Sequence, residues 1–248
     1  MEGDAAEMPF LDHLEELRSR LIWSVAAVGV ASVLGFFVVT ELDLIRLLIE
    51  PIRSLLPEEQ LNFTNPTTPV VVTFKLAFVT GLVLALPVVA YQAWRFFEPA
   101  LMEHEKRYVV PGIWVAFVLF LAGLAMAYFL VLPLGLRFLL GFQTEHLTPI
   151  ITIDEYLRFA TRMILAFGVI FELPVVLLLL SLVGVVTPDG LRHYRRHAYV
   201  GISAAAAFLT PADVGTMLMM MGPMALLYES SIWLVELVAR RRSRRSRA

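Results

Sequence analysis

Two segments of this chain have side chains suited to binding arginine. Residues 10–21, FLDHLEELRSRL, and residues 95–107, RFFEPALMEHEKR, each carry three carboxylates beside a long apolar run. A carboxylate binds a guanidinium group in a bidentate, charge-assisted geometry that lysine does not reproduce. Two such clusters on one side of a membrane, with Phe96 and Phe97 next to the second, predict a receptor for arginine side chains.

The same segments also have a simpler structural explanation. Glu15 with Arg18, and Glu16 with Arg20, are spaced as i,i+3 and i,i+4 helical pairs, each worth about 0.2–0.5 kcal/mol. The leucines of the first segment fall on one helical stripe, which is typical of a helix lying on a membrane surface. The acids of the second segment can pair with the basic residues at its own end. Periodicity alone leaves both interpretations open.

Glu172 lies in the apolar run FGVIFELPVV, near the middle of an expected membrane span. An ionisable side chain there is costly and usually faces a protein interior or a wet cavity, so we expect a functional or inter-subunit role. Glu229 is similar, but it lies nearer the end of its run and can reach the interface. Such an acid also raises an alternative function, a proton-coupled transporter of small solutes. Those transporters commonly contain an internal repeat, and none is evident in this sequence.

Enzyme chemistry is not indicated. The chain has no cysteine, which excludes disulfides, thiol catalysis and cysteine-ligated metals. It has neither a phosphate-binding Gly-Lys loop nor a Gly-x-Ser-x-Gly turn. His193 and His197 have the i,i+4 spacing that can bind a metal, but no third ligand is evident nearby. We therefore expect a protein that is not an enzyme, with no catalytic residue, cofactor or metal.

Membrane-spanning helices must position these residues, because 58% of the chain is hydrophobic and only 17% is charged, far from the composition of soluble proteins. A helix needs about 20 apolar residues to cross a bilayer. The candidate spans are about 21–40, 70–94, 108–132, 162–186, 198–209 and 214–239. We expect an all-α integral membrane protein with one six-helix domain over residues 1–240.

The distribution of basic residues predicts the orientation of these spans. Most of the 20 lysines and arginines fall in segments on the same side as the two termini, including a basic tail over residues 241–248. The positive-inside rule therefore places both termini in the cytoplasm and the protein in the cytoplasmic membrane. The tail has the charge to bind anionic lipid.

The fifth apolar run is too short for an ordinary span. As a helix, residues 198–209 would reach about 18 Å, whereas the hydrocarbon core is about 30 Å thick. Three accommodations are open: local thinning of the membrane, snorkelling of Tyr194, Arg195 and Arg196, or a re-entrant hairpin with the sixth run.

One external loop is expected to contain a helix of its own. Residues 42–56, LDLIRLLIEPIRSLL, have the pattern of an amphipathic helix lying along the interface, broken at Pro51.

Four motifs occur in a specific order along the chain. They are HLEELRSRL before the first span, FFEPALMEHEKR in the first cytoplasmic loop, FELP in the fourth span and LTPADV between the fifth and sixth. Together they resemble the TatC family, the multi-pass core of the twin-arginine protein translocase. The likeness runs from about Pro9 to Leu237.

This resemblance implies a glove-shaped, concave bundle of six helices, with short fifth and sixth helices. It also implies a receptor for signal peptides that bear consecutive arginines on already folded proteins. In the family, a glutamate of the opening motif and a glutamate of the first cytoplasmic loop contact the arginine pair, and a loop aromatic belongs to the same site. By motif, these residues are Glu16, Glu105 and Phe96.

The resemblance also points to other functional positions and to partners. The positions are Arg18 in the opening motif, Pro51 in the external loop, the intramembrane Glu172, Thr210 in a patch that binds a partner helix, and Asp213 in the last external turn. Ala207 and Met217 near Thr210 depart from the polar patch that is common in the family. The implied partners are TatA-type and TatB-type single-span proteins in an oligomeric complex, with the proton motive force driving transport and no nucleic acid involved.

Overall fold

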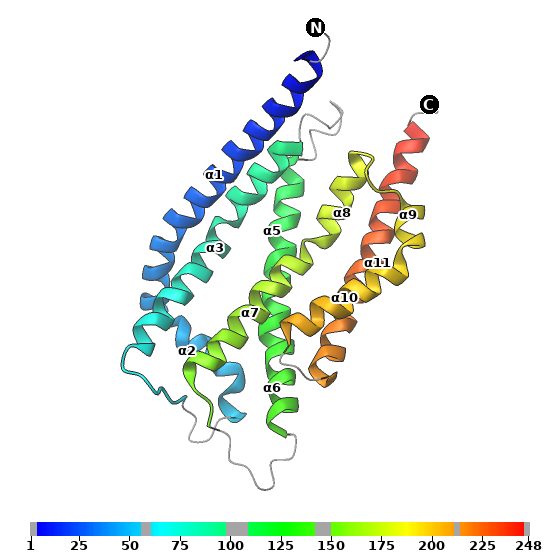
Figure 1. Cartoon of the computed structure of the whole chain (residues 1–248). Helices are drawn as coiled ribbons and strands as arrows, with labels where there is room; N and C mark the ends of the chain where they lie inside the picture. Colours follow the sequence, from blue (N-terminus) through cyan, green and yellow to red (C-terminus); the bar gives the residue numbers. More distant parts are fainter. Residues whose placement is uncertain (1–3, 56–60, 98–108, 142–149, 211–213, 246–248) are drawn as a thin grey trace. The chain divides into compact units, whose positions relative to one another are not determined.

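The computed structural model of this 248-residue chain consists of helices joined by short connections (Figure 1). It describes residues 4–55, 61–97, 109–141, 150–210 and 214–245, with side chains over 14–53, 61–96, 110–141, 150–210 and 214–240. Within these ranges there is no strand beyond an isolated bridge between Asn62 and Thr152. The chain divides into two compact units. Unit 1 comprises Met1–Asp43 and Thr73–Phe117, and unit 2 comprises Leu44–Val72 and Val118–Ala248.

Unit 1 contains helix α1 (Asp4–Glu41), most of α3 (Thr68–Phe97) and the start of α5 (Val109–Met126). Helices α1 and α3 cross where small residues meet. A Cβ atom on Gly35 would lie 2.4 Å from the carbonyl oxygen of Ala77, and one on Gly81 would lie 2.4 Å from the Cα of Ser32. The two backbones approach this closely because neither glycine has a side chain.

In unit 2, α5 continues without interruption through a π-helical turn, η4 (Ala127–Val131), into α6 (Leu132–Gly141). The backbone N–H of Leu132 bonds to the carbonyl of Ala127, five residues back. Pro133 follows directly and has no N–H to donate, which normally ends or bends a helix. The wide turn precedes the proline, and the chain stays helical to Gly141, beyond the expected end near residue 132.

Helices α7 (Ile153–Phe171) and α8 (Leu173–Leu182) form the fourth span and are interrupted at Glu172. Pro174 causes the break, because it cannot donate a hydrogen bond to the preceding turn. The span begins earlier than the expected residue 162, because the charged residues before it are helical. Arg158 and Asp154 pair at 2.8 Å within the first turns of α7.

The core of unit 2 contains a close crossing of α5 and α7. Phe120 and Phe167 are fully buried. A Cβ atom on Gly168 would lie 2.7 Å from the Phe120 ring, and one on Gly123 would lie 2.5 Å from the carbonyl oxygen of Phe167. Gly168 therefore makes the space that the Phe120 ring fills, and Gly123 lets α5 approach the backbone of α7.

The segment after α1 forms α2 (Leu44–Ile49) and a 3₁₀ helix, η1 (Glu50–Leu55), both packed in unit 2. The α-helical geometry ends at Ile49, two residues before Pro51, and gives way to the 3₁₀ helix, as expected from the missing N–H of the proline. The predicted break in this segment is confirmed.

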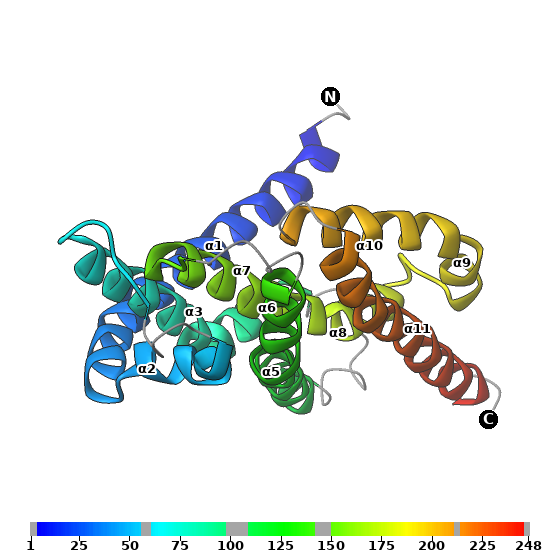
Figure 2. The same ribbon diagram turned by 90° about the horizontal axis from the view of Figure 1, so that it is seen from below.

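The chain ends with α9 (Pro188–His193), α10 (Arg195–Leu209) and α11 (Val214–Arg245), and α10 packs beside α11 (Figure 2). Helix α10 has 15 residues, or about 22 Å, which confirms a short fifth helix. The expectation of a short sixth helix is wrong: α11 has 32 residues, and 27 of them, Val214–Arg240, are apolar enough to form a candidate membrane span.

Five helices in the described residues are long and apolar enough to cross a membrane, and α10 is not among them. Their bounds are Leu14–Glu41, Thr68–Phe96, Val110–Gly141, Ile153–Leu182 and Val214–Arg240. The chain is thus an all-α, multi-pass membrane protein.

Candidate functional site

Glu16 lies in the early part of α1, where its carboxylate is held by an arginine one turn later. Its Oε1 accepts a hydrogen bond from Nη2 of Arg20 at 3.0 Å. The other terminal nitrogen of Arg20, Nη1, donates to Oε1 of Gln92 on α3 at 3.2 Å. Arg20 therefore joins the Glu16 carboxylate to a second helix of unit 1.

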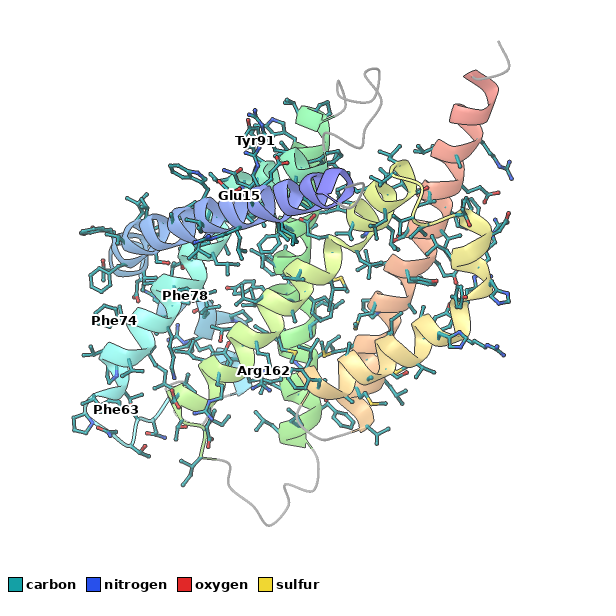
Figure 3. All side chains as sticks on the ribbon, turned by 45° about the horizontal axis from the view of Figure 1, so that its top comes forward. Glu15, Phe63, Phe74, Phe78, Tyr91 and Arg162 are labelled. Carbon is teal, nitrogen blue, oxygen red and sulfur yellow. The ribbon has the colours of Figure 1, made fainter. Side chains whose placement is uncertain are left out.

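The other pair expected in this motif is not formed. Glu15 and Arg18 are both exposed, and the described residues contain no ion pair between them. Glu15 lies on α1 near the end of α3 that carries Tyr91 (Figure 3). Of the two pairs that the spacing predicted, the Glu16–Arg20 pair is therefore confirmed, and the Glu15 side chain is exposed on the surface of α1.

Phe96 lies in the last turn of α3, one turn after Gln92, and is partly exposed. Arg95 beside it donates to the Tyr91 hydroxyl at 2.7 Å. Glu105, the second carboxylate expected at this site, lies outside the described residues. The helices on either side of it meet within unit 1, because a Cβ atom on Gly112 of α5 would lie 2.4 Å from the Trp94 ring.

Glu172 occupies the interruption between α7 and α8. The backbone N–H of Glu172 donates to the carbonyl of Val169 at 3.1 Å, and the carbonyl of Glu172 accepts from the N–H of Val176 at 2.9 Å. Its carboxylate oxygen Oε1 is buried and has no hydrogen-bond partner among the described residues. An acid placed in a span without a partner remains available for a group supplied from outside the chain.

Pro51 is partly buried, and two tyrosines hold the turn before it. The carbonyl of Leu47, four residues before the proline, accepts a hydrogen bond from the Tyr128 hydroxyl at 2.6 Å. The next carbonyl, that of Leu48, accepts one from the buried Tyr156 at 2.5 Å. These hydroxyls supply donors at the turn where the proline interrupts the helical ladder, an arrangement that sequence analysis missed.

Thr210 is buried, and its hydroxyl donates to the carbonyl of Ala206 at 3.0 Å. It borders a small pocket of about 40 Å³ in unit 2, together with Thr216 and Pro223 of α11 and Phe159 of α7. Thr216 was not predicted, although it is a lone hydroxyl in an apolar stretch. Asp213 lies outside the described residues.

A ladder of ion pairs joins α9 and α10 to α11. Arg195 pairs with Glu229 at 2.6 Å, and the Tyr199 hydroxyl donates to the same carboxylate at 2.9 Å. Arg192 pairs with Glu236 at 2.5 Å. The sequence indicated only that Glu229 is similar to Glu172 and can reach the interface. In the structure, two side chains of α10 engage its carboxylate.

His193 and His197, whose i,i+4 spacing could bind a metal, both pack against the ring of Tyr194. His193 and His197 have ring centroids 5.1 Å and 5.6 Å from that of Tyr194. Among the described residues, no group of three or more His, Asp or Glu side chains is arranged to hold a metal ion.

Comparison with known proteins gives one family. Residues 12–223 match the family model described as Sec-independent protein translocase protein (TatC). The TatC of Aquifex aeolicus is 40% identical over 237 residues, covering 95% of this chain and 98% of that protein. TatCy of Bacillus subtilis is 34% identical over 249 residues, covering 98% and 94%.

A solved structure agrees with these sequence matches. The crystal structure described as twin arginine translocase receptor TatC has a TM-score of 0.81 and 40% identity, and the match covers 92% of this chain and 99% of that one. The match of helices, motifs and length over nearly the whole sequence shows that this chain belongs to the TatC family of Sec-independent protein translocase proteins.

Proposed function

We propose that this chain is the core receptor subunit of a twin-arginine translocase, which binds twin-arginine signal peptides and exports folded proteins across the cytoplasmic membrane. The observation that carries the proposal is the Glu16 carboxylate, joined through Arg20 and Gln92 to α3 one turn before Phe96. Membership of the TatC family supports it. That membership gives no support to a small-solute transporter built around Glu172.

The proposed activity is recognition without covalent chemistry. Each arginine of the signal presents two parallel N–H donors to a carboxylate, and charge-assisted hydrogen bonds of this kind contribute about 1.5–3 kcal/mol. Glu16 supplies one carboxylate, and Glu105 supplies the other. Phe96 offers an aromatic face beside them, over which a guanidinium can also stack. Lysine presents a point charge and loses the paired geometry.

The remaining expected residues have roles in assembly and transport under this proposal. Thr210 contributes to the docking of a TatA-type or TatB-type helix, and Glu172 meets a partner or cargo segment within the membrane. Pro51 and Asp213 act in the external turns, and Arg18 acts in the opening motif. The proton motive force supplies the energy for transport.

Replacement of the two glutamates tests the site directly. We expect Glu105→Gln, and to a lesser degree Glu16→Gln, to weaken crosslinking of a twin-arginine signal peptide to this chain in membranes. The loss reflects the removed negative charge, because glutamine keeps the shape but accepts weaker hydrogen bonds. Glu15→Gln is the matched control, since it removes the same charge from an exposed position on the same helix. Unchanged binding in the Glu16→Gln, Glu105→Gln double variant would exclude the site.

Complementation tests the activity as a whole. In a strain that lacks its own TatC, this chain, expressed with single-span Tat partners, should restore export of a folded reporter with a twin-arginine signal. The same reporter with two lysines should remain inside the cell. Export of both reporters, or of neither, would contradict the proposal.

A further inference from the structure

The Glu16 carboxylate is already paired with an arginine of the same helix, Arg20, in the absence of a signal peptide. Arg20 contacts it at 3.0 Å, and the two side chains are only 26% and 31% exposed. An incoming guanidinium must therefore either displace Arg20 or share the carboxylate with a positive charge next to it. Both alternatives reduce the affinity of Glu16 for a second cation.

The contact between Arg20 and Glu16 uses only one nitrogen of the guanidinium. Arg20 donates from Nη2 to Glu16 and from Nη1 to Gln92, while its buried Nε has no partner in the part of the chain that the structure describes. Among the described residues, no other hydrogen bond reaches the Glu16 carboxylate. Gln92 thus holds Nη1 away from Glu16, so the end-on contact through both terminal nitrogens is not made. The side-on contact through Nε and Nη2 is not made either, and Arg20 binds Glu16 at one point only.

We infer that Arg20 is an internal competitor that sets the affinity threshold of the signal-binding site, and that Gln92 limits its strength. A signal arginine exceeds this threshold because it can bind Glu16 through two nitrogens where Arg20 uses one. A signal lysine offers a single donor point and gains nothing over the residue that it must displace. The inference rests on the proposed role of Glu16 in binding signals.

Competition makes a specific quantitative prediction. Removing an internal competitor raises the affinity of every ligand of the site by the same factor. For the loss of one charge-assisted hydrogen bond, we expect that factor to be about tenfold. Arg20→Gln should therefore bring a lysine-lysine signal into the detectable range while the ratio of the two affinities stays nearly constant.

The experiment uses the full chain in lipid nanodiscs with fluorescent synthetic signal peptides carrying either Arg-Arg or Lys-Lys. Binding is measured by fluorescence anisotropy for wild type, Arg20→Gln and Arg95→Gln. Arg95 is the matched control, because it removes the same charge from the end of α3, where its guanidinium contacts Tyr91. We expect parallel gains for both peptides in Arg20→Gln, and a much smaller change in Arg95→Gln. Thermal unfolding verifies that each variant is folded.

A second variant, Gln92→Ala, should change the affinity for both peptides in the opposite direction from Arg20→Gln. Gln92→Ala leaves Arg20 in place but releases Nη1, which can then move onto Glu16 and complete a two-point contact. We expect both peptides to bind about threefold more weakly to this variant. A general loss of positive charge cannot produce this result, because Gln92→Ala changes no charge.

The Glu16→Gln background separates this inference from the proposed function. If Glu16→Gln leaves Arg-Arg binding unchanged, the proposed site fails whatever Arg20 does. If Glu16→Gln weakens binding and Arg20→Gln then has no further effect in that background, competition at Glu16 is supported. The inference is overturned if Arg20→Gln leaves binding unchanged or weakens it in the wild-type background, or if Gln92→Ala strengthens it.

Discussion

At the scale of single residues, Glu172 is an acid for which the described residues provide no hydrogen bond at one oxygen. Burying a polar group without a partner costs free energy, and the carboxylate sits at a helix interruption that already lacks part of the backbone ladder. We expect Glu172→Leu to raise the free energy of unfolding by about 1–3 kcal/mol in detergent. In the same variant, export in the complementation assay should fall, if the proposed role of the carboxylate is correct.

Glu172→Gln serves as the control for this prediction, since it keeps the polar atoms and should give no gain in stability. Stability and transport would then change in opposite directions in Glu172→Leu, as is common for residues kept for function. Lower stability of both variants, measured by thermal unfolding, would mean that Glu172 has a stabilising partner in the protein.

The residue-level predictions succeeded where partners are close in sequence. The Glu16–Arg20 pair follows from i,i+4 spacing, because a helix brings such residues together. Gln92, which is 72 positions from Arg20, and Arg195, which is 34 positions from Glu229, are paired by tertiary packing. Helical periodicity within one segment contains no information about those partners.

At the scale of elements, the turn before Pro51 depends on two tyrosine hydroxyls. Tyr156→Phe would leave the buried Leu48 carbonyl without its donor and should cost about 1–3 kcal/mol of stability. Tyr128→Phe should cost less, because its contact with Leu47 is exposed and water can replace the hydroxyl. Limited proteolysis of the 42–56 segment would measure this, with faster cleavage expected in Tyr156→Phe. Equal cleavage rates in wild type and Tyr156→Phe would argue against the tyrosine contact.

The α1–α3 crossing makes an independent prediction. Gly81→Ala and Gly35→Ala place a Cβ atom against the backbone of the facing helix, which must move apart, and we expect each to destabilise unit 1 by about 1–3 kcal/mol. Gly29→Ala is the matched control on α1, because a Cβ atom there has nothing within 4 Å. Thermal unfolding should show a loss for the first two variants and none for the third.

The elements themselves were partly predictable. Long apolar runs give the existence of the helices, because backbone polar groups in lipid must bond within the segment. Their ends were less predictable: the π turn before Pro133 extends one helix, and the ion-paired start of α7 extends another. Pro133 in the first helix and the charged residues at the start of α7 both indicated a loop. The helix nevertheless continues at each place, because the π turn keeps the backbone hydrogen-bonded and the Arg158–Asp154 pair stabilises the first turns of α7.

At the scale of the whole molecule, the sequence predicted an all-α multi-pass protein of the cytoplasmic membrane, and the structure and family relationships confirm this description. Composition and the order of motifs were sufficient for that result. The geometry of the proposed signal-binding site was less predictable, because it depends on which helices meet, as α1 and α3 do at Arg20 and Gln92. Glu105, the second carboxylate of that proposal, lies outside the described residues.

The ion pair between Arg195 and Glu229 bears on how the short helix α10 meets a bilayer. A snorkelling side chain must extend freely toward the headgroups, but the Arg195 guanidinium is already directed inward to α11. Of the residues that could lengthen α10 in this way, Tyr194 and Arg196 remain exposed. Because Arg195 is paired with Glu229, one fewer side chain of α10 can extend to the headgroups. Local thinning of the bilayer must then account for more of the mismatch between α10 and the hydrocarbon core.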